Sequence, residues 1–168
     1  MLRMTGHQVL AQGAVRGFTL IELVITVAIV ALLATAAFPM ADLAVQRDHE
    51  RELQRALRQI RDAIDGYKQA SDEGRMIKSV GASGYPKRLE ELVDGVDDRK
   101  SAKREKIYFL RRIPRDPFNA DTTLAPSATW GKRSYASAPD DPREGDDVYD
   151  VYSLAPGKGI NGRPYREW

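Results

Sequence analysis

The chain has 168 residues, of which 42% are hydrophobic and 30% are charged, and its formal net charge is +2. This length suits one domain, and a charge so close to neutral argues against nucleic acid as a main partner. There is no cysteine, which excludes disulfide bonds and thiolate metal sites.

The first predicted element is an apolar run that begins at Phe18 and ends at Phe38. In a helix this run spans roughly 30 Å, the hydrocarbon thickness of a bilayer. Residues 1–17 before it are weakly basic and contain no acidic residue, a pattern that holds this end in the cytoplasm. We therefore predict a leader at 1–17 and a transmembrane helix at 18–39.

Glu22 is the only charged residue in the apolar run. A carboxylate inside a membrane-length helix is costly, so Glu22 is a candidate functional residue. An ordinary secretory signal peptide is one interpretation, because Ala34-Thr35-Ala36 fits a small-x-small cleavage pattern. A plain membrane anchor is another, with Glu22 near the helix start, where the helix dipole makes an anion less costly.

A third interpretation comes from the sequence Arg16-Gly17-Phe18-Thr19-Leu20-Ile21-Glu22-Leu23. It resembles the class III signal of type IV pilins and type II secretion pseudopilins. The resemblance implies cleavage between Gly17 and Phe18 by a membrane-bound aspartic prepilin peptidase, followed by N-methylation of Phe18. It also implies that the apolar helices form a filament core, in which Glu22 pairs with the Phe18 amine of a neighbouring subunit and fixes the axial register.

Residues 40 to about 71 have helical periodicity. Apolar side chains recur every three or four residues, with charged residues between them, at Leu53, Leu57, Ile60, Ile64 and Tyr67. We predict a stalk helix that continues from the membrane segment and packs its apolar face on a sheet. Its charged face is either solvated or in contact with neighbouring subunits.

The rest of the chain predicts a small α+β domain over residues 40–168. A glycine-rich linker ends the stalk helix, and a short helix is expected at about 86–93. Alternating patterns predict strands at about 130–136 and 148–154, paired as an antiparallel hairpin on the stalk helix. The densely charged stretch 94–106 is expected to be an exposed loop.

Four downstream motifs narrow the resemblance to the major pseudopilin of type II secretion, the G-type subunit. They are Tyr-Pro-x-x-Leu-x-x-Leu at 85–92, Tyr-x-Leu-x-x-Ile-Pro-x-Asp-Pro-Phe at 108–118, Trp-Gly-x-x-Ser-Tyr at 130–135 and Val-Tyr-Ser-Leu at 151–154. The resemblance implies a pilin-like α+β fold and a subunit of a periplasmic pseudopilus. It implies a single-pass protein of the bacterial inner membrane with its C-terminal domain in the periplasm. The implied partners are further copies of the chain, minor pseudopilins, the prepilin peptidase and the inner-membrane assembly platform.

Major pseudopilins bind calcium in the loop after the last long strand. Here that loop, residues 155–163, contains no acidic residue, which argues against a calcium site there. Three aspartates nearby are the alternative ligands, unless they only form a solvated acidic turn: Asp146, Asp147 and Asp150. The tail could instead be ordered by Tyr165 and Trp168 packing back onto the sheet.

The sequence contains no set of residues typical of catalysis. His49 is the only histidine after the leader, and no Ser/His/Asp set or phosphate-binding glycine loop is present. We therefore expect a structural protein without a cofactor. A type IV pilus subunit, major or minor, is one alternative, and a membrane-tethered periplasmic binding domain that never polymerises is another.

Overall fold

The computed structural model describes residues 17–103 and 105–168, and for residues 36–41 it describes the backbone alone. The predicted leader therefore lies outside the described residues, except for Gly17. The chain divides into two compact units between Asp42 and Leu43. We call the part from Leu43 to Trp168 the head and describe each unit by itself.

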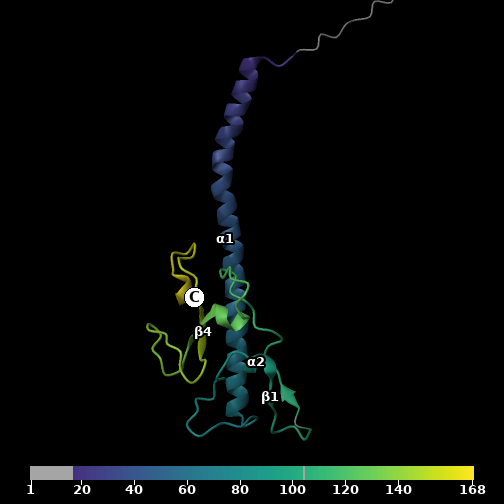
Figure 1. The fold of residues 1–168 in the computed structure, drawn as a ribbon, viewed down its shortest axis with the longest axis vertical. Coiled ribbons are helices and arrows are strands. Elements are labelled where there is room, and N and C mark those ends of the chain that lie inside the picture. The colour runs from purple at the N-terminus through teal and green to yellow at the C-terminus, as the bar shows by residue number, and fades with distance from the viewer. Residues whose placement is uncertain (1–16, 104) are drawn as a thin grey trace, which may run out of the picture. The chain divides into compact units, whose positions relative to one another are not determined.

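Helix α1 (Leu20–Asp72) is the longest element, and its head portion confirms the predicted stalk helix (Figure 1). The helix ends in a Schellman-type turn. The amide of Arg75 donates to the carbonyl of Ala70 at 3.0 Å, and Gly74 takes a positive φ of 69°. Glycine adopts this conformation at little cost, so Gly74 fixes the end of α1.

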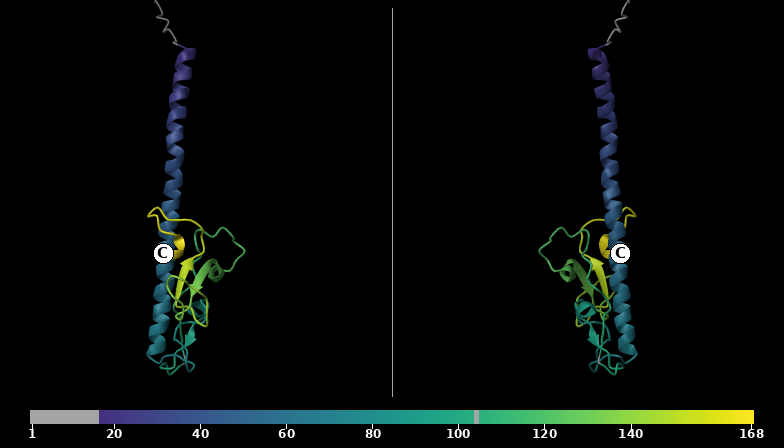
Figure 2. Two further views of the ribbon diagram at one scale, coloured as in Figure 1. Left: turned by 90° about the vertical axis from the view of Figure 1, so that its left-hand side faces the viewer. Right: turned by 90° about the vertical axis from the view of Figure 1, so that its right-hand side faces the viewer.

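The other elements are short. In chain order they are α2 (Glu91–Asp94), β1 (Val96–Asp97), β2 (Lys106–Ile107), the 3₁₀ turn η1 (Pro126–Thr129), β3 (Trp130–Arg133), β4 (Asp150–Ser153) and the 3₁₀ turn η2 (Tyr165–Glu167). They gather along the head portion of α1 (Figure 2). Within the part of the chain that the structure describes, none of the helices combines the length and apolarity that crossing a membrane requires.

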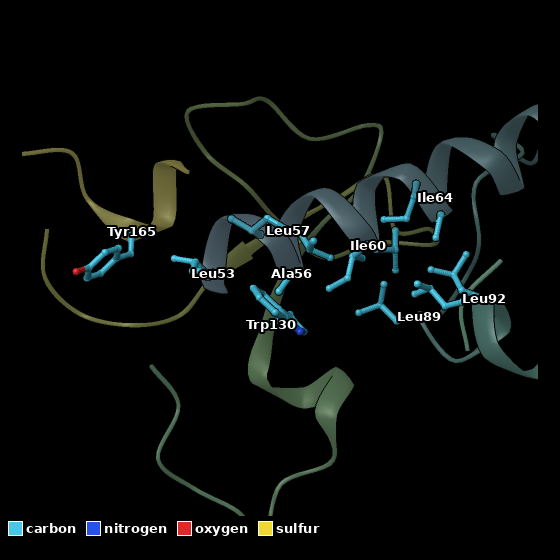
Figure 3. Packing of buried hydrophobic residues seen from close by; sticks show 13 residues of the cluster. Leu53, Ala56, Leu57, Ile60, Ile64, Leu89, Leu92, Trp130 and Tyr165 are labelled. Atoms are coloured by element: carbon cyan, nitrogen blue, oxygen red, sulfur yellow. The ribbon is translucent and has the colours of Figure 1, made fainter. Parts of the chain in front are cut away.

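The core of the head lies between α1 and these short elements (Figure 3). Leu53, Ile60 and Ile64 of α1 are fully buried, and Leu89 and Trp130 pack in the same cluster. Together with buried Leu57, these α1 residues have the three- and four-residue spacing that predicted the apolar face of the stalk helix. Burying a side chain of this size stabilises the fold by about 1.5–3 kcal/mol, so this face holds the head together.

The strands form two separate antiparallel pairs, β1 with β2 and β3 with β4. In the second pair, Trp130 lies opposite Ser153 and Arg133 lies opposite Asp150. The predicted hairpin is therefore present and the fold is α+β and pilin-like: a long N-terminal helix packed with a small antiparallel sheet.

The predicted strands at 130–136 and 148–154 are too long. Strand β3 ends after Arg133, because the amide of Ser134 donates to the carbonyl of Arg143 at 2.9 Å and the chain turns. The amide of Val148 donates to the carbonyl of Pro86 at 2.7 Å, outside the ladder, and β4 begins at Asp150.

The predicted helix at 86–93 is also wrong in its extent, because α2 has only one turn. The Pro86 carbonyl, which such a helix needs for its own ladder, is taken by Val148. The backbone hydrogen bonds just before α2 close tight turns and do not extend the helix. One of them runs from the Glu91 amide to the Arg88 carbonyl at 3.2 Å.

The charged stretch expected to be a loop contains the β1–β2 hairpin instead. Val96 pairs with Ile107, and Asp97 pairs with Lys106. An ion pair between Arg75 and Asp98, and a 2.7 Å bond from the Arg99 amide to the Arg75 carbonyl, tie this hairpin to the end of α1. The hairpin thus depends on contacts that the local charge pattern does not reveal.

Candidate functional site

The start of α1 is fixed by Thr19. Its hydroxyl oxygen accepts a hydrogen bond from the Glu22 amide at 3.3 Å, and its carbonyl accepts one from the Leu23 amide at 3.1 Å. Thr19 is therefore the N-cap of α1, with Glu22 at the third helical position. A threonine followed three residues later by a glutamate is the sequence pattern of a capping box, and it explains locally why the helix begins here.

The predicted cleavage site lies directly before this cap. Gly17 and Phe18 are outside the helix, and the side chain of Phe18 is 79% exposed. Adding a Cβ to Gly17 meets no atom within 4 Å, so the backbone at the bond between the two residues is accessible. Glu22 is exposed in the first turn of α1, where the helix dipole favours an anion.

The helix that follows is apolar on all sides. Eleven large apolar side chains between Phe18 and Leu33 are each 52–81% exposed. Two threonines of α1 donate their hydroxyls to helix carbonyls, Thr26 to Leu23 at 2.8 Å and Thr35 to Leu32 at 2.7 Å. Because a helix that is hydrophobic all round needs a covering, this surface points to lipid or to other apolar helices.

The three candidate calcium ligands are used by the fold in different ways. Asp150 accepts from Arg61 Nε at 2.8 Å, and Arg133 approaches it at 3.5 Å. Asp147 accepts the Tyr135 amide at 2.8 Å and so closes the β3–β4 loop, whereas Asp146 is exposed. Among the described residues, no three histidine, cysteine or acidic side chains converge as metal ligands.

The C-terminal tail is held on α1 by Glu50, a residue that the sequence interpretation missed. The Glu50 side chain is buried, with 8% of the residue exposed. Its carboxylate accepts bonds from Gln46 Nε2 at 3.0 Å, the Ile160 amide at 2.9 Å and the Tyr165 hydroxyl at 3.0 Å. Burial raises the pKa of the Tyr165 phenol, and the nearby Glu50 carboxylate adds to that rise.

Arg61 makes a second attachment of the tail. Its guanidinium donates to Asp150, to the Val151 carbonyl at 3.1 Å and to the main-chain oxygen of Trp168 at 2.7 Å. Tyr165 and Trp168 also pack against the core, as the sequence suggested. A sequence signal existed for both missed residues, because Glu50 and Arg61 lie at the edge of the apolar stripe, three residues before Leu53 and four after Leu57.

Several residues of the downstream motifs join the 108–118 segment to the β3–β4 sheet. Asp116 is only 2% exposed and accepts the Ser153 hydroxyl at 2.5 Å. The Trp130 indole donates to the Pro114 carbonyl at 2.8 Å. Gly131 lies beneath the Tyr152 ring, where a Cβ would come within 2.3 Å of ring carbon, so only glycine fits. The motifs are therefore explained by packing within the head.

An open groove of about 1120 Å³ lies between residues 79–85 and the β3–β4 loop. Tyr85 and Tyr135 line it and stack with ring centroids 5.7 Å apart. Burial raises the pKa of the Tyr85 phenol. Carboxylates of the acidic turn, Asp146 and Asp147, form part of the same lining.

Residues 13–38 match the family model of the prokaryotic N-terminal methylation motif. The chain carries a prepilin-type signal. The motif includes Gly17, Phe18 and Glu22, so it confirms the pilin-like interpretation of the N-terminus over the secretory signal peptide and the plain anchor. No curated protein and no solved structure matches the chain.

The methylation motif relates the Thr19 cap and Glu22 to the predicted new amino terminus. The predicted cleavage after Gly17 makes Phe18 the amino-terminal residue, one position before the Thr19 cap. The cap keeps the helix start in place without residues 1–17, because both of its bonds go to residues inside α1. A free amine and the Glu22 carboxylate then lie on the same short segment.

Proposed function

We propose that the chain is a structural subunit of a filament, processed by a prepilin peptidase and polymerised through its N-terminal helix. The observation that carries this proposal is the methylation motif on a helix whose apolar side chains are exposed in every direction. Before assembly the apolar segment lies in the bacterial inner membrane, with the head in the periplasm. After assembly it lies among the same segments of other copies.

Glu22 has the task of selecting the register of this polymer. An unpaired charge buried among apolar helices costs about 3–5 kcal/mol. The amine of Phe18 in a neighbouring copy supplies the opposite charge, and its methylation leaves that charge in place. Only an axial displacement that brings the two groups together avoids the cost, so the pair defines how one copy sits beside the next.

The finer assignment we propose is a pseudopilus of type II secretion. It rests on the motifs at 85–92, 108–118, 130–135 and 151–154, whose residues hold the head together. Partners on this proposal are minor pseudopilins, the prepilin peptidase and the inner-membrane assembly platform. We propose a structural role without catalysis, since the exposed helix and the processing motif account for the features of the N-terminus.

Processing is tested by mass spectrometry of the chain purified from bacterial membranes that contain a prepilin peptidase. The expected mass corresponds to a chain that begins at Phe18 and carries one added methyl group. A Gly17→Val variant, which places a branched side chain at the cleaved bond, is expected to keep residues 1–17. An intact leader on the unaltered chain contradicts the proposal and favours a tethered binding domain.

Assembly is tested by comparing Glu22→Ala with Thr26→Ala in the same membranes. Glu22→Ala removes the carboxylate and should abolish multimers that can be trapped by cross-linking. Thr26→Ala changes a neighbouring polar side chain that already bonds within its own helix, and should assemble normally. A Glu22→Ala chain that forms filaments of unchanged register contradicts the role of Glu22.

A further inference from the structure

Three tyrosines form an aromatic cluster at the open groove between residues 79–85 and the β3–β4 loop. The Tyr85 ring stacks on the Tyr135 ring, with centroids 5.7 Å apart, and the Tyr149 ring meets both of them edge-on at 5.0 and 5.5 Å. Tyr85 and Tyr135 line the groove, and Tyr135 is 62% exposed. The other two rings therefore hold an exposed ring in place at the groove.

Two rings of this cluster already have a cation of the head above them. Lys68 Nζ lies 5.5 Å from the centroid of the Tyr85 ring. The guanidinium carbon of Arg133 lies 4.6 Å from the centroid of the Tyr149 ring. Within the described part of the chain, no side chain does the same for Tyr135. Because the face of an aromatic ring attracts a cation within about 6 Å, the Tyr135 ring is suited to a cation from another molecule.

Acidic residues outnumber basic ones in the lining of the groove. The charged side chains that line it are four carboxylates and two cations: Asp141, Glu144, Asp146, Asp147, Lys87 and Arg143. Asp147 accepts the Tyr135 amide at 2.8 Å, so its carboxylate is held beside that residue. Asp146 forms no ion pair with any residue that the structure describes. Carboxylates beside an exposed aromatic ring favour an ammonium or guanidinium group as the ligand.

The tip of the β1–β2 hairpin carries cations of this kind. Arg99, Lys100 and Lys103 are exposed there, and the structure shows no ion pair for them among the residues it describes. Residues 99–103 include no acidic residue. The hairpin lies to the right of α1 in Figure 1, whereas the β3–β4 loop lies to its left. The tip therefore does not occupy the groove of its own copy.

We propose that the hairpin tip of one copy of the chain binds in the groove of a second copy. A cation of the tip then lies over the Tyr135 ring and beside Asp146. The groove measures about 1120 Å³, as large as the protein sites of about 300–1,000 Å³ that enclose drug-sized ligands. It therefore has room for side chains of the tip.

This contact rests on the proposed filament and deepens it. Its two surfaces differ and lie on different sides of the head, so the contact is heterologous. Each copy offers its groove to one neighbour and its hairpin to another, and no surface has to receive two neighbours. Heterologous contacts that do not close into a ring generate open helical filaments. The contact is contained within the head, so it requires no particular arrangement of the apolar segment.

Cysteine pairs test the contact directly, because the chain contains no cysteine. Ala102→Cys places a thiol on the hairpin tip, and Ala136→Cys places one in the lining of the groove. The full chain with both changes should form disulfide-linked ladders under mild oxidation in membranes that contain a prepilin peptidase. Either cysteine alone links at most two copies. Ala102→Cys with Ala120→Cys moves the second thiol to an exposed loop outside the groove, and should give at least fivefold fewer ladders.

Charge exchange in the chain with the hairpin and groove cysteines tests complementarity. Lys100→Glu with Lys103→Glu should lower the ladder yield at least fivefold, and so should Asp141→Lys with Asp146→Lys. All four exchanges together restore opposite charges and should return the yield to within twofold of the parent. Arg111→Glu with Arg112→Glu is the matched control, because these exposed arginines lie outside the hairpin, and it should leave the yield within twofold.

The role of the aromatic ring is tested at Tyr135 in the same chain. Tyr135→Leu removes the ring face and should lower the ladder yield at least threefold. Tyr135→Phe keeps the ring face and should leave the yield within twofold. Equal losses from both substitutions contradict a cation above the ring.

A separate cysteine distinguishes this contact from the proposed filament. Ala28→Cys alone places a thiol in the apolar segment, so its cross-links between copies report assembly independently of the head. If these cross-links form but the hairpin and groove cysteines give no more ladders than the control pair, the contact is overturned and the filament stands. Losses that the four exchanges do not recover also overturn the contact. So does an Ala136→Cys chain that cross-links to a protein other than this chain. If neither kind of cross-link forms, both proposals are overturned.

Discussion

Asp116 is a carboxylate that the head has almost completely buried, with 2% of the residue exposed. Its oxygens accept the Ser153 hydroxyl at 2.5 Å and the Phe118 amide at 2.9 Å. Its own amide donates to the Thr129 hydroxyl at 3.1 Å. One residue therefore links the 108–118 segment to η1 through its amide and to β4 through its carboxylate, which explains the aspartate between Pro114 and Pro117 in this motif.

Asp116→Ala should lower the free energy of unfolding by about 2–4 kcal/mol. The substitution leaves a buried hydroxyl and a backbone amide without their acceptor, and each such loss costs about 1–3 kcal/mol. Urea unfolding of the full chain in detergent, followed by tryptophan fluorescence, measures the effect, because Trp130 is buried and Trp168 packs against the same core. Asp121→Ala removes a similar turn from an exposed loop, where Asp121 bonds Thr123. If Asp121→Ala lowers the free energy of unfolding as much as Asp116→Ala does, the burial of Asp116 does not explain its effect.

A second carboxylate, Asp98, makes the stability of the head depend on pH in the acid range. The hydrogen bond and charge of Arg75 hold the pKa of Asp98 below its ordinary value. A carboxyl whose pKa is lower in the folded state stabilises the fold fully above the unfolded pKa of about 3.9. This stabilisation is lost as the pH falls through the lower folded pKa.

Arg75→Met should therefore weaken the head at pH 6 and reduce the loss of stability as the pH falls below about 4. Melting temperatures of the variant and the parent across this range provide the measurement. Arg143→Met breaks the pair of Arg143 with Asp141, in which both side chains are mostly exposed, and serves as the control. An Arg75→Met chain with the same acid profile as the parent contradicts the role of this pair.

The tail is an element whose order comes from side chains of α1. Ile160 is exposed, but its amide donates to the buried Glu50 carboxylate. At Gly159, next to it, a Cβ would come within 2.3 Å of the Trp168 ring, so the tail turns tightly under that ring. Glu50 thus holds, through Ile160, the 155–163 loop in which the resembling family binds calcium, and Arg61 holds the residues on either side of it.

Glu50→Ala should increase hydrogen exchange at the Ile160 amide at least tenfold, since an exposed amide is protected mainly by its hydrogen bond. Glu50→Gln keeps an oxygen acceptor and should retain most of the protection. Exchange is measured on the full chain by mass spectrometry of peptides that cover residues 155–168. Glu52→Ala, on the exposed side of α1, should change nothing. Unaltered exchange in Glu50→Ala shows that other contacts order the tail.

The elements that the sequence predicted well are those whose pattern is local. The stalk helix follows from the spacing of Leu53, Leu57 and Ile60, and the match to the methylation motif at residues 13–38 follows from a motif of consecutive residues. The extent of the short helix and the start of β4 were wrong, because they depend on a bond between Pro86 and Val148. Those two residues are far apart in the sequence, and nothing near either of them reveals the bond.

The candidate functional residues also fall into two groups, those recognised from a local motif and those whose partners are distant in the sequence. Gly17, Phe18 and Glu22 are recognisable because they lie close together in the sequence, and the methylation motif covers them. Glu50 and Arg61 looked like members of a charged helix face, since their partners at residues 150–168 return to α1 only in the folded head. A charged residue on a helix is buried only when a distant segment of the chain packs over it. The sequence around Glu50 and Arg61 does not reveal which segment does so.

At the scale of the whole molecule, one helix serves two different environments. In the head, α1 is apolar on one face and buries Leu53, Ile60 and Ile64 against the short elements. Between Leu20 and Leu33 it is apolar on every side, and those side chains are exposed. The head portion of α1 is stabilised by contacts within the chain. The portion from Leu20 to Leu33 needs apolar surroundings that the chain does not supply.

Ile60→Ala and Ile29→Ala should separate these two roles. Ile60 is 0% exposed, so its truncation leaves a cavity and should lower the free energy of unfolding of the head by about 2–5 kcal/mol. Ile29 is 52% exposed, so its truncation should leave head unfolding within about 0.5 kcal/mol of the parent. On the proposed function Ile29 lies in the filament core, and its loss should lower the yield of cross-linked multimers several-fold.

Both variants are measured in the same full chain, by tryptophan fluorescence in urea and by cross-linking through a cysteine introduced in the apolar segment as Ala28→Cys. Ile60→Ala should still be processed at Gly17, because the peptidase acts on a segment with its own helix cap. Ala44→Gly, at an exposed position of the head's first turn of α1, controls for a general loss of helix propensity. If Ile29→Ala destabilises the head as much as Ile60→Ala does, the two portions of α1 do not have separate roles. If it assembles as well as the parent, the apolar surface around Ile29 is not part of a packed filament core.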